Sequence, residues 1–234
     1  MCGRFATTQT DDELLQVFGA AEAVGEPLPP SYNVAPTDPV RTVLERVPKD
    51  HPDSAAVRQL RTARWGLIPS WAKDRKIGAK LINARMETIT EKPSFKAAAS
   101  RRRCLVPANG YYEWEKQGAT KVPHFLHGDG VLAMAGLYEL WRDPQAAADD
   151  PDRWVLSVTV LTTTASDTLG HIHDRSPVLV PGELRDAWLD PTITNPHEVQ
   201  QLLAEVGEPH LEPYVVSTAV NNVANNSPEL LRPV

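Results

Sequence analysis

Proline is the residue that most restricts how this chain can fold. The 234 residues include 21 prolines, and they are spread along the whole sequence rather than gathered in one segment. Because proline lacks a backbone N–H and holds φ near −65°, it interrupts helix interiors and central strands. The sequence therefore predicts many short helices and strands joined by rigid turns, without long helices.

Hydrophobic periodicity and capping signals place these short elements along the chain. Helices are expected over residues 11–19, 94–100, 166–170, 182–189 and 196–206. Strands are expected over residues 40–47, 64–68, 104–114, 123–127, 131–138, 154–163, 177–180 and 213–217. Since strands and helices do not alternate as in βαβ units, residues 1–234 are predicted to form a single α+β domain. We expect a mostly antiparallel, barrel-like β-sheet with flanking short helices.

Three local features sharpen this prediction. Thr10 and Glu13 have the spacing of a capping box, which predicts the start of the helix over residues 11–19. The sequence Gly-Asp-Gly at 128–130 predicts a hairpin turn between two strands. Residues 48–60 and 143–153 follow no periodic pattern, so they are predicted to be surface insertions without an assigned role.

Composition excludes several classes of protein. The best apolar stretch, residues 131–141, is too short for a transmembrane helix and contains Glu139, and the first twelve residues lack the apolar region of a signal peptide. Two cysteines, Cys2 and Cys104, are too few for a disulfide scaffold and suit a reducing cytoplasm. We therefore expect a cytoplasmic monomer that does not bind membranes.

Charge is distributed unevenly along the chain. The net charge is −6, but residues 54–86 contain eight basic and one acidic residue, while residues 143–213 contain three basic and thirteen acidic residues. Trp65 and Trp71 lie inside the basic segment, a mixture that suits single-stranded nucleic acid. A local positive surface on an acidic protein is one interpretation, and an ordinary solvated surface with core tryptophans is the other.

Cys2 has the most specific chemistry in the sequence. Removal of the initiator methionine leaves an α-amine and a thiol on one residue, both partly nucleophilic near neutral pH. The amine of such an aminothiol condenses with an aldehyde, and the sulfur then closes a five-membered thiazolidine ring in a fast intramolecular step. Gly3 permits close approach and Arg4 suits an anion. A small buried cysteine beside a frayed terminus is the alternative.

Three further clusters contain polar residues suited to a reaction site. Asn83 and Arg85 alternate in an extended segment and suit an amine or sugar oxygen and a phosphate. Glu113 lies among aromatic residues, which can raise its pKa for proton transfer. His173 beside an aspartate suits a general acid, although each cluster also fits a structural role. We expect no metal or cofactor, because His171 and His173 lack further ligands at a recognised spacing.

Seven segments, in one order from the first residue to the last, carry a resemblance to a known family. They are MCGRFA at 1–6, YNVAP at 32–36, WGLIPSW at 65–71, LINARMET at 81–88, RRCLVPANGYYEW at 102–114, HIHDRSPV at 171–178 and NNVANNSPELLRPV at 221–234. In these segments the chain resembles the SOS-response-associated peptidase family. That resemblance implies a protein that acts on abasic sites in single-stranded DNA at stalled forks, with replication-fork proteins as expected partners.

The resemblance also implies roles for single residues. Cys2, freed by autoproteolytic removal of Met1, would form a thiazolidine with the open aldehyde of the abasic site and protect it from strand cleavage and error-prone repair. Asn83 would hold the amine, Glu113 would transfer protons and His173 would protonate the sugar oxygen. DNA contacts are implied for Arg4, Arg85, Arg175, Trp65, Trp71 and Thr162.

Two other classes of function stay open at this point. An N-terminal-nucleophile amidohydrolase, such as a glutamine amidotransferase, also begins Met-Cys-Gly and uses the thiolate against an amide. A non-catalytic reader of modified bases would bind DNA reversibly and would not need the thiol. Release of glutamate from glutamine would favour the first, and binding that survives Cys2→Ala would favour the second.

Overall fold

A mixed sheet of eleven strands organises the computed structural model, which describes residues 2–48, 50–51, 53–150, 153–165, 170–207 and 209–234. The strands are β1 (Arg4–Thr7), β2 (Glu22–Val24), β3 (Ser31–Val34), β4 (Pro39–Arg46), β5 (Val57–Trp65), β6 (Asn83–Arg85), β7 (Arg103–Gln117), β8 (Thr120–Arg142), β9 (Trp154–Thr164), β10 (Arg175–Pro177) and β11 (Glu212–Val215). The α-helices are α1 (Asp11–Phe18), α2 (Lys96–Arg101), α4 (Arg185–Leu189) and α5 (Pro196–Glu205). The 3₁₀ helices are η1 (Arg75–Lys80), η2 (Met86–Thr88), η4 (Gly182–Leu184), η5 (Thr218–Asn221) and η6 (Pro228–Leu231).

Five of the strands close into a ring. The pairing runs from β8 through β9, β5, β4 and β7 and returns to β8, while β1 and β3 continue the sheet beyond β7. Most pairs are antiparallel, and β5 and β6 each pair with β9 in parallel. The predicted α+β class with a mostly antiparallel sheet is confirmed.

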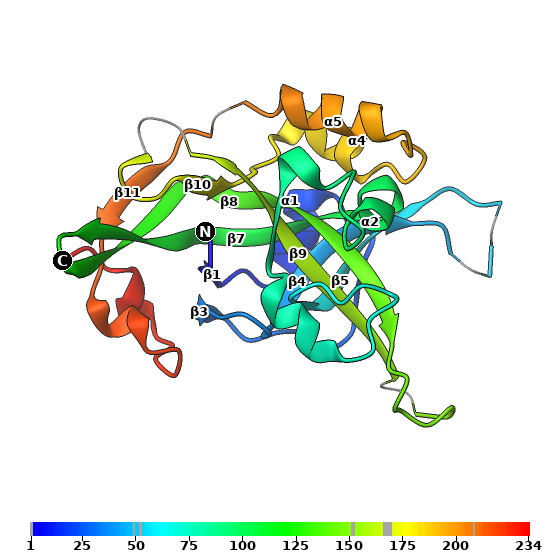
Figure 1. The fold of residues 1–234 in the computed structure, drawn as a ribbon, viewed down its shortest axis with the longest axis horizontal. Coiled ribbons are helices and arrows are strands. Elements are labelled where there is room, and N and C mark those ends of the chain that lie inside the picture. The colour runs from blue at the N-terminus through cyan, green and yellow to red at the C-terminus, as the bar shows by residue number, and fades with distance from the viewer. Residues whose placement is uncertain (1, 49, 52, 151–152, 166–169, 208) are drawn as a thin grey trace.

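Two large hydrophobic cores, with two smaller clusters beside them, hold this arrangement together. One core fills the ring and includes Cys2, Trp65, Cys104 and Tyr138. The other lies between the sheet and the helices α1, α2, α4 and α5, with α4 and α5 lying together along one edge of the molecule in Figure 1. The buried Arg103 donates to backbone carbonyls around α2 and α4, including Trp188 O at 2.7 Å, and so joins these helices to β7.

The helix α1 begins where the sequence predicts. The Thr10 hydroxyl accepts from the Glu13 N–H at 3.3 Å, and the Glu13 carboxylate accepts from the Thr10 N–H at 2.8 Å. This capping box satisfies two backbone donors that a helix leaves unpaired. Gly19 ends the helix in the left-handed conformation, with φ 61°.

The prediction of a hairpin turn at residues 128–130 is wrong. Strand β8 continues through these residues, because β7 pairs with it on both sides of them: Gly110 opposes His127 and Ala108 opposes Leu132. Residues 128–131 therefore form a bulge opposite residue 109, and Gly130 takes φ 77° there. The glycines allow β8 to bend at this bulge, and the chain does not reverse its direction there.

The two predicted insertions connect neighbouring strands of the ring and project from it at the right of Figure 1. The first is shorter than expected, because residues 57–60 belong to β5, which pairs with β4 from Val57 onward. The helix expected over residues 166–170 falls mostly on residues 166–169, outside the described part of the chain. Over the described residues, none of the helices is both long and apolar enough to cross a bilayer.

Candidate active site

Cys2 lies just before β1, where that strand joins the edge of β7. Arg4 pairs with Tyr112 and Phe5 pairs with Tyr111, so the start of the chain is held beside the second half of β7. The Cys2 side chain has no exposed surface. Burial, and secondarily the charge of Glu113, raise the pKa of the Cys2 thiol, so the sulfur is held as a neutral thiol.

Asn83 contacts Cys2 directly. Strand β6 places it against β9, where Asn83 pairs with Val160. Its amide Nδ2 donates to the Cys2 carbonyl oxygen at 2.7 Å. Its Oδ1 is buried and accepts no hydrogen bond within the described residues, so this atom can take a further donor. The sequence predicted both residues for the site, and the structure brings them together.

Glu113 lies on β7 beside Cys2 and is buried, with 4% of its surface exposed. Burial raises the pKa of Glu113 from its ordinary value of 4.5 to about 7, and the charge of Asp174 adds to the rise. A carboxyl group with this pKa can both accept and return a proton near neutral pH. Glu113 is therefore suited to general acid–base chemistry at the Cys2 sulfur and nitrogen.

His173 lies across a pocket from Glu113. Its Nδ1 accepts a hydrogen bond from the Arg175 N–H at 3.0 Å and lies 2.9 Å from Asp174 Oδ1. Burial lowers the pKa of His173, which favours the neutral form of the ring. The two residues line a pocket of about 400 Å³ together with Trp114, Lys121 and Asn221.

The three arginines with expected phosphate contacts differ in their surroundings. Arg85 is exposed at the end of β6. The Arg4 guanidinium donates to Asn33 Oδ1 at 2.6 Å and to carbonyl oxygens of residues 220 and 221. Arg175 is buried and forms a two-point ion pair with Glu87, at 2.6 and 3.0 Å. Only Arg85 among them presents its side chain openly to solvent.

The two tryptophans of the basic segment differ in their exposure to solvent. Trp65 is completely buried, donates from its indole N–H to Ile82 O at 3.0 Å and packs edge-on against Phe5. It therefore belongs to the core and does not reach DNA directly. Trp71 is 58% exposed, so it can contact a base. Thr162 is 1% exposed, with its hydroxyl 3.4 Å from the Arg175 guanidinium, which places it beneath the surface.

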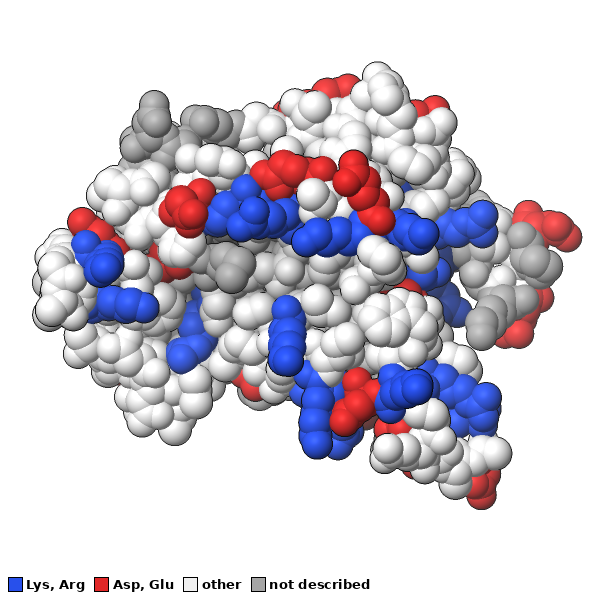
Figure 2. All heavy atoms as spheres, viewed as in Figure 1, with Lys and Arg blue, Asp and Glu red and all other residues white. Residues whose placement is uncertain are grey.

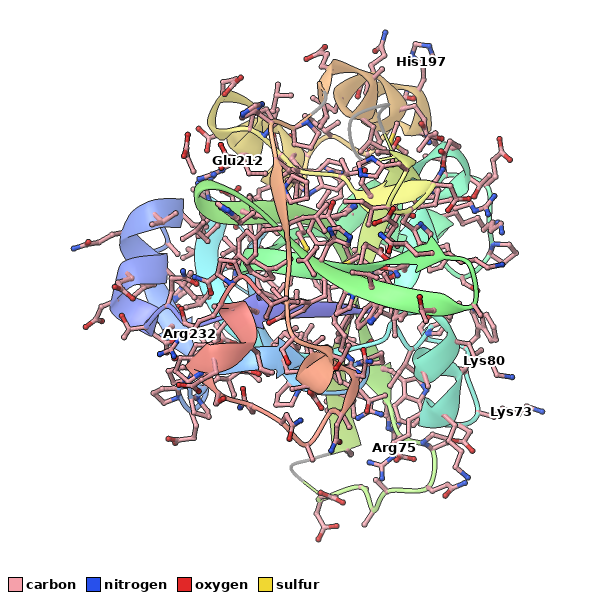
Figure 3. The ribbon with its side chains drawn as sticks, turned by 90° about the vertical axis from the view of Figure 1, so that its left-hand side faces the viewer. Lys73, Arg75, Lys80, His197, Glu212 and Arg232 are labelled. Carbon is pink, nitrogen blue, oxygen red and sulfur yellow. The ribbon has the colours of Figure 1, made fainter. Side chains whose placement is uncertain are left out.

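Basic side chains gather on the face that carries β10 and β9. Figure 2 shows a band of lysine and arginine across this face, with acidic side chains along one side of the band. The segment around η1 adds Lys73, Arg75 and Lys80, all exposed, and Figure 3 shows Lys73 and Lys80 pointing outward. The positive surface expected from residues 54–86 thus forms partly around the exposed Trp71, mixed with carboxylates.

Several residues around the site were missed by the sequence analysis. Asn33 is buried and donates to carbonyl oxygens of residues 222 and 225, which fastens the C-terminal segment beside Arg4. Lys121 lines the pocket with Glu113. The asparagines at 221, 222, 225 and 226 were the available signal, because such residues satisfy irregular backbone.

No cluster of three or more His, Cys, Asp or Glu side chains with the geometry of a metal site occurs in the described parts of the chain. His173 is instead engaged by Arg175 and Asp174. The side chains that the structure groups at this site are a thiol, a carboxyl group, an amide and an imidazole.

Comparisons with known proteins identify the family and the fold of the chain. The chain is 39% identical to the abasic site processing protein YoqW of Bacillus subtilis, over 99% of both chains, and 32% identical to the abasic site processing protein HMCES of Xenopus tropicalis, over 99% of this chain and 78% of the relative. A solved structure of a protein from Bacteroides thetaiotaomicron has the same fold, with a TM-score of 0.81, 24% identity and full coverage of both chains. Residues 1–223 match the profile of the SOS response associated peptidase family. The chain therefore belongs to the SOS response associated peptidase family.

Proposed function

We propose that this protein processes abasic sites in single-stranded DNA by linking Cys2 covalently to the open aldehyde of the site. The observation that carries the proposal is the grouping of Cys2 with Glu113, whose pKa is about 7, and with Asn83, which holds the Cys2 carbonyl at 2.7 Å. The relatives named abasic site processing proteins support the choice of substrate.

The first step is hydrolysis of the Met1–Cys2 peptide bond at the same centre. Water is consumed, methionine leaves, and Cys2 then carries a free amine and a thiol. Without this step Cys2 has no primary amine, so no imine can form. The buried Oδ1 of Asn83 is the acceptor that would hold the new amine near the Cys2 carbonyl.

The second step joins the amine to the aldehyde carbon. Nitrogen attacks the carbonyl, and loss of one water molecule leaves an imine. The neutral thiol of Cys2 then adds to the imine carbon: a C–S bond forms, the thiol proton leaves through Glu113, and the nitrogen receives a proton. The product is a saturated thiazolidine, which cannot undergo the β-elimination that breaks the DNA strand at an open imine.

His173 has a different part in this scheme. Abasic sugars are mostly closed hemiacetals, and opening requires a proton on the ring oxygen. The protonated imidazolium form of His173, which lines the same pocket as Glu113, supplies that proton, and the neutral ring that is left takes it back during reversal. Glu113 and His173 therefore act on one sugar from the same pocket.

DNA is held around the pocket by the exposed basic and aromatic residues. Arg85 contacts a phosphate and Trp71 stacks on or beside a base. Arg4 and Arg175 contribute from their hydrogen-bonded positions, while Trp65 and Thr162 shape the surface from beneath. The protein acts as a monomer on DNA at replication forks, associated with the nucleoid.

A crosslinking assay tests the proposal. The purified chain is mixed with a single-stranded oligonucleotide that carries one abasic site, and adducts are separated on a denaturing gel after heating. Wild-type protein should form a stable adduct and Cys2→Ala should form none. Cys104→Ala is the matched control, because Cys104 is also buried and lies in the same core, and it should crosslink normally.

Two further arms separate the alternatives. Cys2→Ser should give only an imine that borohydride can trap, and protein that retains Met1 by intact mass should give no adduct. Equal crosslinking by Met1-retaining protein would overturn the mechanism. Release of glutamate from glutamine would point to an amidohydrolase, and binding without any adduct would point to a reader of modified bases.

A further inference from the structure

A second pocket opens at the opposite end of the strand ring from Cys2. It has a volume of about 570 Å³, within the usual range for small-molecule sites. Trp154 and Leu156, at the start of β9, line it, whereas Thr162 on the same strand lies beside Arg175. Eight residues of extended chain separate Trp154 from Thr162, about 26 Å at 3.3 Å per residue. The pocket and the Cys2 site are therefore separate.

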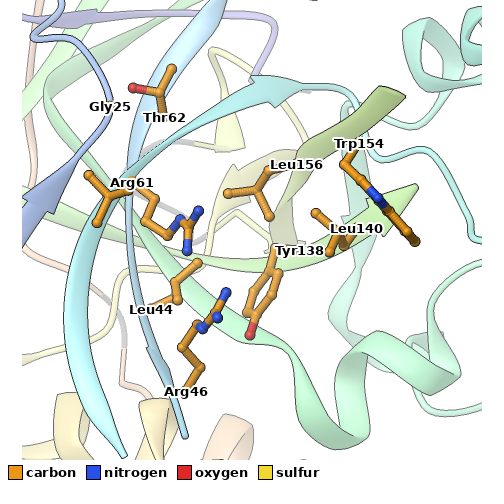
Figure 4. Close-up of a pocket in the computed structure, with 10 residues that line it drawn as sticks. Gly25, Leu44, Arg46, Arg61, Thr62, Tyr138, Leu140, Trp154 and Leu156 are labelled. Atoms are coloured by element: carbon orange, nitrogen blue, oxygen red, sulfur yellow. The ribbon is translucent and has the colours of Figure 1, made fainter. Parts of the chain in front are cut away.

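Two arginines extend their side chains into this pocket. Figure 4 shows Arg46 from β4 and Arg61 from β5 with their guanidinium groups toward its centre, near the Tyr138 ring. Within the described residues neither forms an ion pair, and the hydrogen bond that Arg61 donates to Gln59 Oε1 is long, at 3.5 Å. Glu22 is the acid on the neighbouring strand, and its carboxylate accepts from Gln59 at 2.7 Å.

Two other arginines of the same strands are neutralised, whereas Arg64 on β5 donates to the Thr37 carbonyl oxygen at 3.0 Å. Arg41 on β4 pairs with Asp11, and Arg58 on β5 pairs with Glu45 and Asp186. Burial and the charge of Arg46 both lower the pKa of Arg61, because two cations face one space. Two half-buried positive charges without a carboxylate are costly unless an anion joins them.

The rest of the pocket is apolar. Leu44, Leu140 and Leu156 line it beside the Trp154 indole. Leu140 and Trp154 are among the few exposed large hydrophobic side chains of the protein, at 38% and 47%. An exposed apolar rim beside a charged centre is typical of a ligand site rather than of a bare surface. A flat ring would cover these side chains while its anionic group met the arginines.

We propose that this pocket binds a small phosphate monoester with an aromatic body, of the size of a nucleoside monophosphate. A phosphate monoester carries nearly two negative charges at neutral pH, which match the two guanidinium groups, whereas a carboxylate would match one. Guanidinium groups bind phosphate oxygens through paired N–H donors. The aromatic body accounts for Trp154 and the three leucines, which inorganic phosphate would leave uncovered.

Calorimetric titration of the full chain with 2′-deoxyadenosine 5′-monophosphate tests this proposal. Saturable binding is expected, with deoxyadenosine and inorganic phosphate each at least about tenfold weaker. Arg46→Met keeps most of the side-chain volume and should weaken nucleotide binding at least tenfold, while Arg46→Lys should recover part of it. Arg101→Met, an exposed position on α2, is the matched control and should bind like wild type.

Crosslinking to abasic DNA separates this pocket from the Cys2 site. Arg46→Met should crosslink at the wild-type rate, since its pocket lies at the other end of the ring. Equal nucleotide affinity in wild type and Arg46→Met, absence of saturable binding, or displacement of the nucleotide by single-stranded DNA would each overturn the proposal. If Arg46→Met unfolds, Trp154→Ala at the exposed rim replaces it, and unchanged affinity in that variant has the same meaning.

Discussion

Replacing Glu113 by glutamine keeps the shape of the side chain and removes its ability to exchange a proton. Burial raises the pKa of Glu113 from 4.5 to about 7. At this pKa about a tenth of the protein carries the ionised carboxylate at pH 6, about half at pH 7 and about nine tenths at pH 8. If the carboxylate takes the thiol proton, the crosslinking rate of wild type should rise about tenfold from pH 6 to pH 8.

The Glu113→Gln variant should lose this acid–base assistance. General acid–base groups contribute about 10²- to 10⁴-fold, so a rate decrease in that range is expected, without the rise between pH 6 and pH 8. Single-turnover crosslinking to abasic single-stranded DNA, sampled over time on denaturing gels at three pH values, measures both effects. Glu115→Gln is the matched control, because Glu115 lies two residues along β7 and contacts His124 instead of Cys2.

The same substitution should change stability in the opposite direction. A carboxyl pKa that is higher in the folded state means that folded protein binds the proton more tightly than unfolded protein. This contribution is fully present below pH 4.5 and is lost as the pH rises toward 7, a loss of about 3 kcal/mol. Glutamine does not ionise, so Glu113→Gln should be more stable than wild type at pH 8, and the two should converge near pH 4.

Urea unfolding at pH 5 and pH 8 measures that difference. The reasoning about Glu113 would be refuted by a glutamine variant that crosslinks at the wild-type rate with the same pH profile. A variant that is less stable than wild type at pH 8 would refute the argument that a buried carboxylate destabilises this site. The two readouts are independent, because one follows the reaction and the other follows folding.

Three further predictions concern the surroundings of the site. Asn83→Ala removes the 2.7 Å hydrogen bond to the Cys2 carbonyl and should slow crosslinking at least about tenfold on the same gels, and a wild-type rate would contradict its positioning role. Arg85→Met should reduce the salt dependence of noncovalent DNA binding by about one unit of slope, and an unchanged slope would exclude a phosphate contact. Trp65→Ala should lower the free energy of unfolding by about 3–5 kcal/mol in urea, because the indole is fully buried, and a loss below about 1 kcal/mol would contradict that burial.

Local signals in the sequence predicted local structure well. The capping box at Thr10 and Glu13 and the buried periodic residues after it depend only on neighbours in the chain, and α1 forms as expected. Gly128 and Gly130 predicted a turn, but the chain does not turn there, because β7 continues to pair with β8 on both sides of these glycines. A glycine indicates where the backbone can bend, but the partner strand decides whether it reverses.

The candidate active site also combines features that the sequence predicts with features that only the fold decides. The aminothiol chemistry of Cys2 and the candidate roles of Asn83 and Glu113 follow from residue type. Their meeting depends on β1 joining β7 and on β6 joining β9, pairings between segments about 80 to 110 residues apart in sequence. Trp65 and Arg175 illustrate the limit, since their residue types suit DNA but the fold uses them in the core and in an ion pair with Glu87.

The sequence alone determined the class of fold, the aminothiol nucleophile and the polar residue types that could assist it, because these depend on composition, local pattern and covalent chemistry. Tertiary structure alone decided which of those residues meet, how deeply Glu113 is buried and where Arg46 and Arg61 come together. Burial and long-range strand pairing set these properties, and neither can be read from residues that are near each other only in the chain.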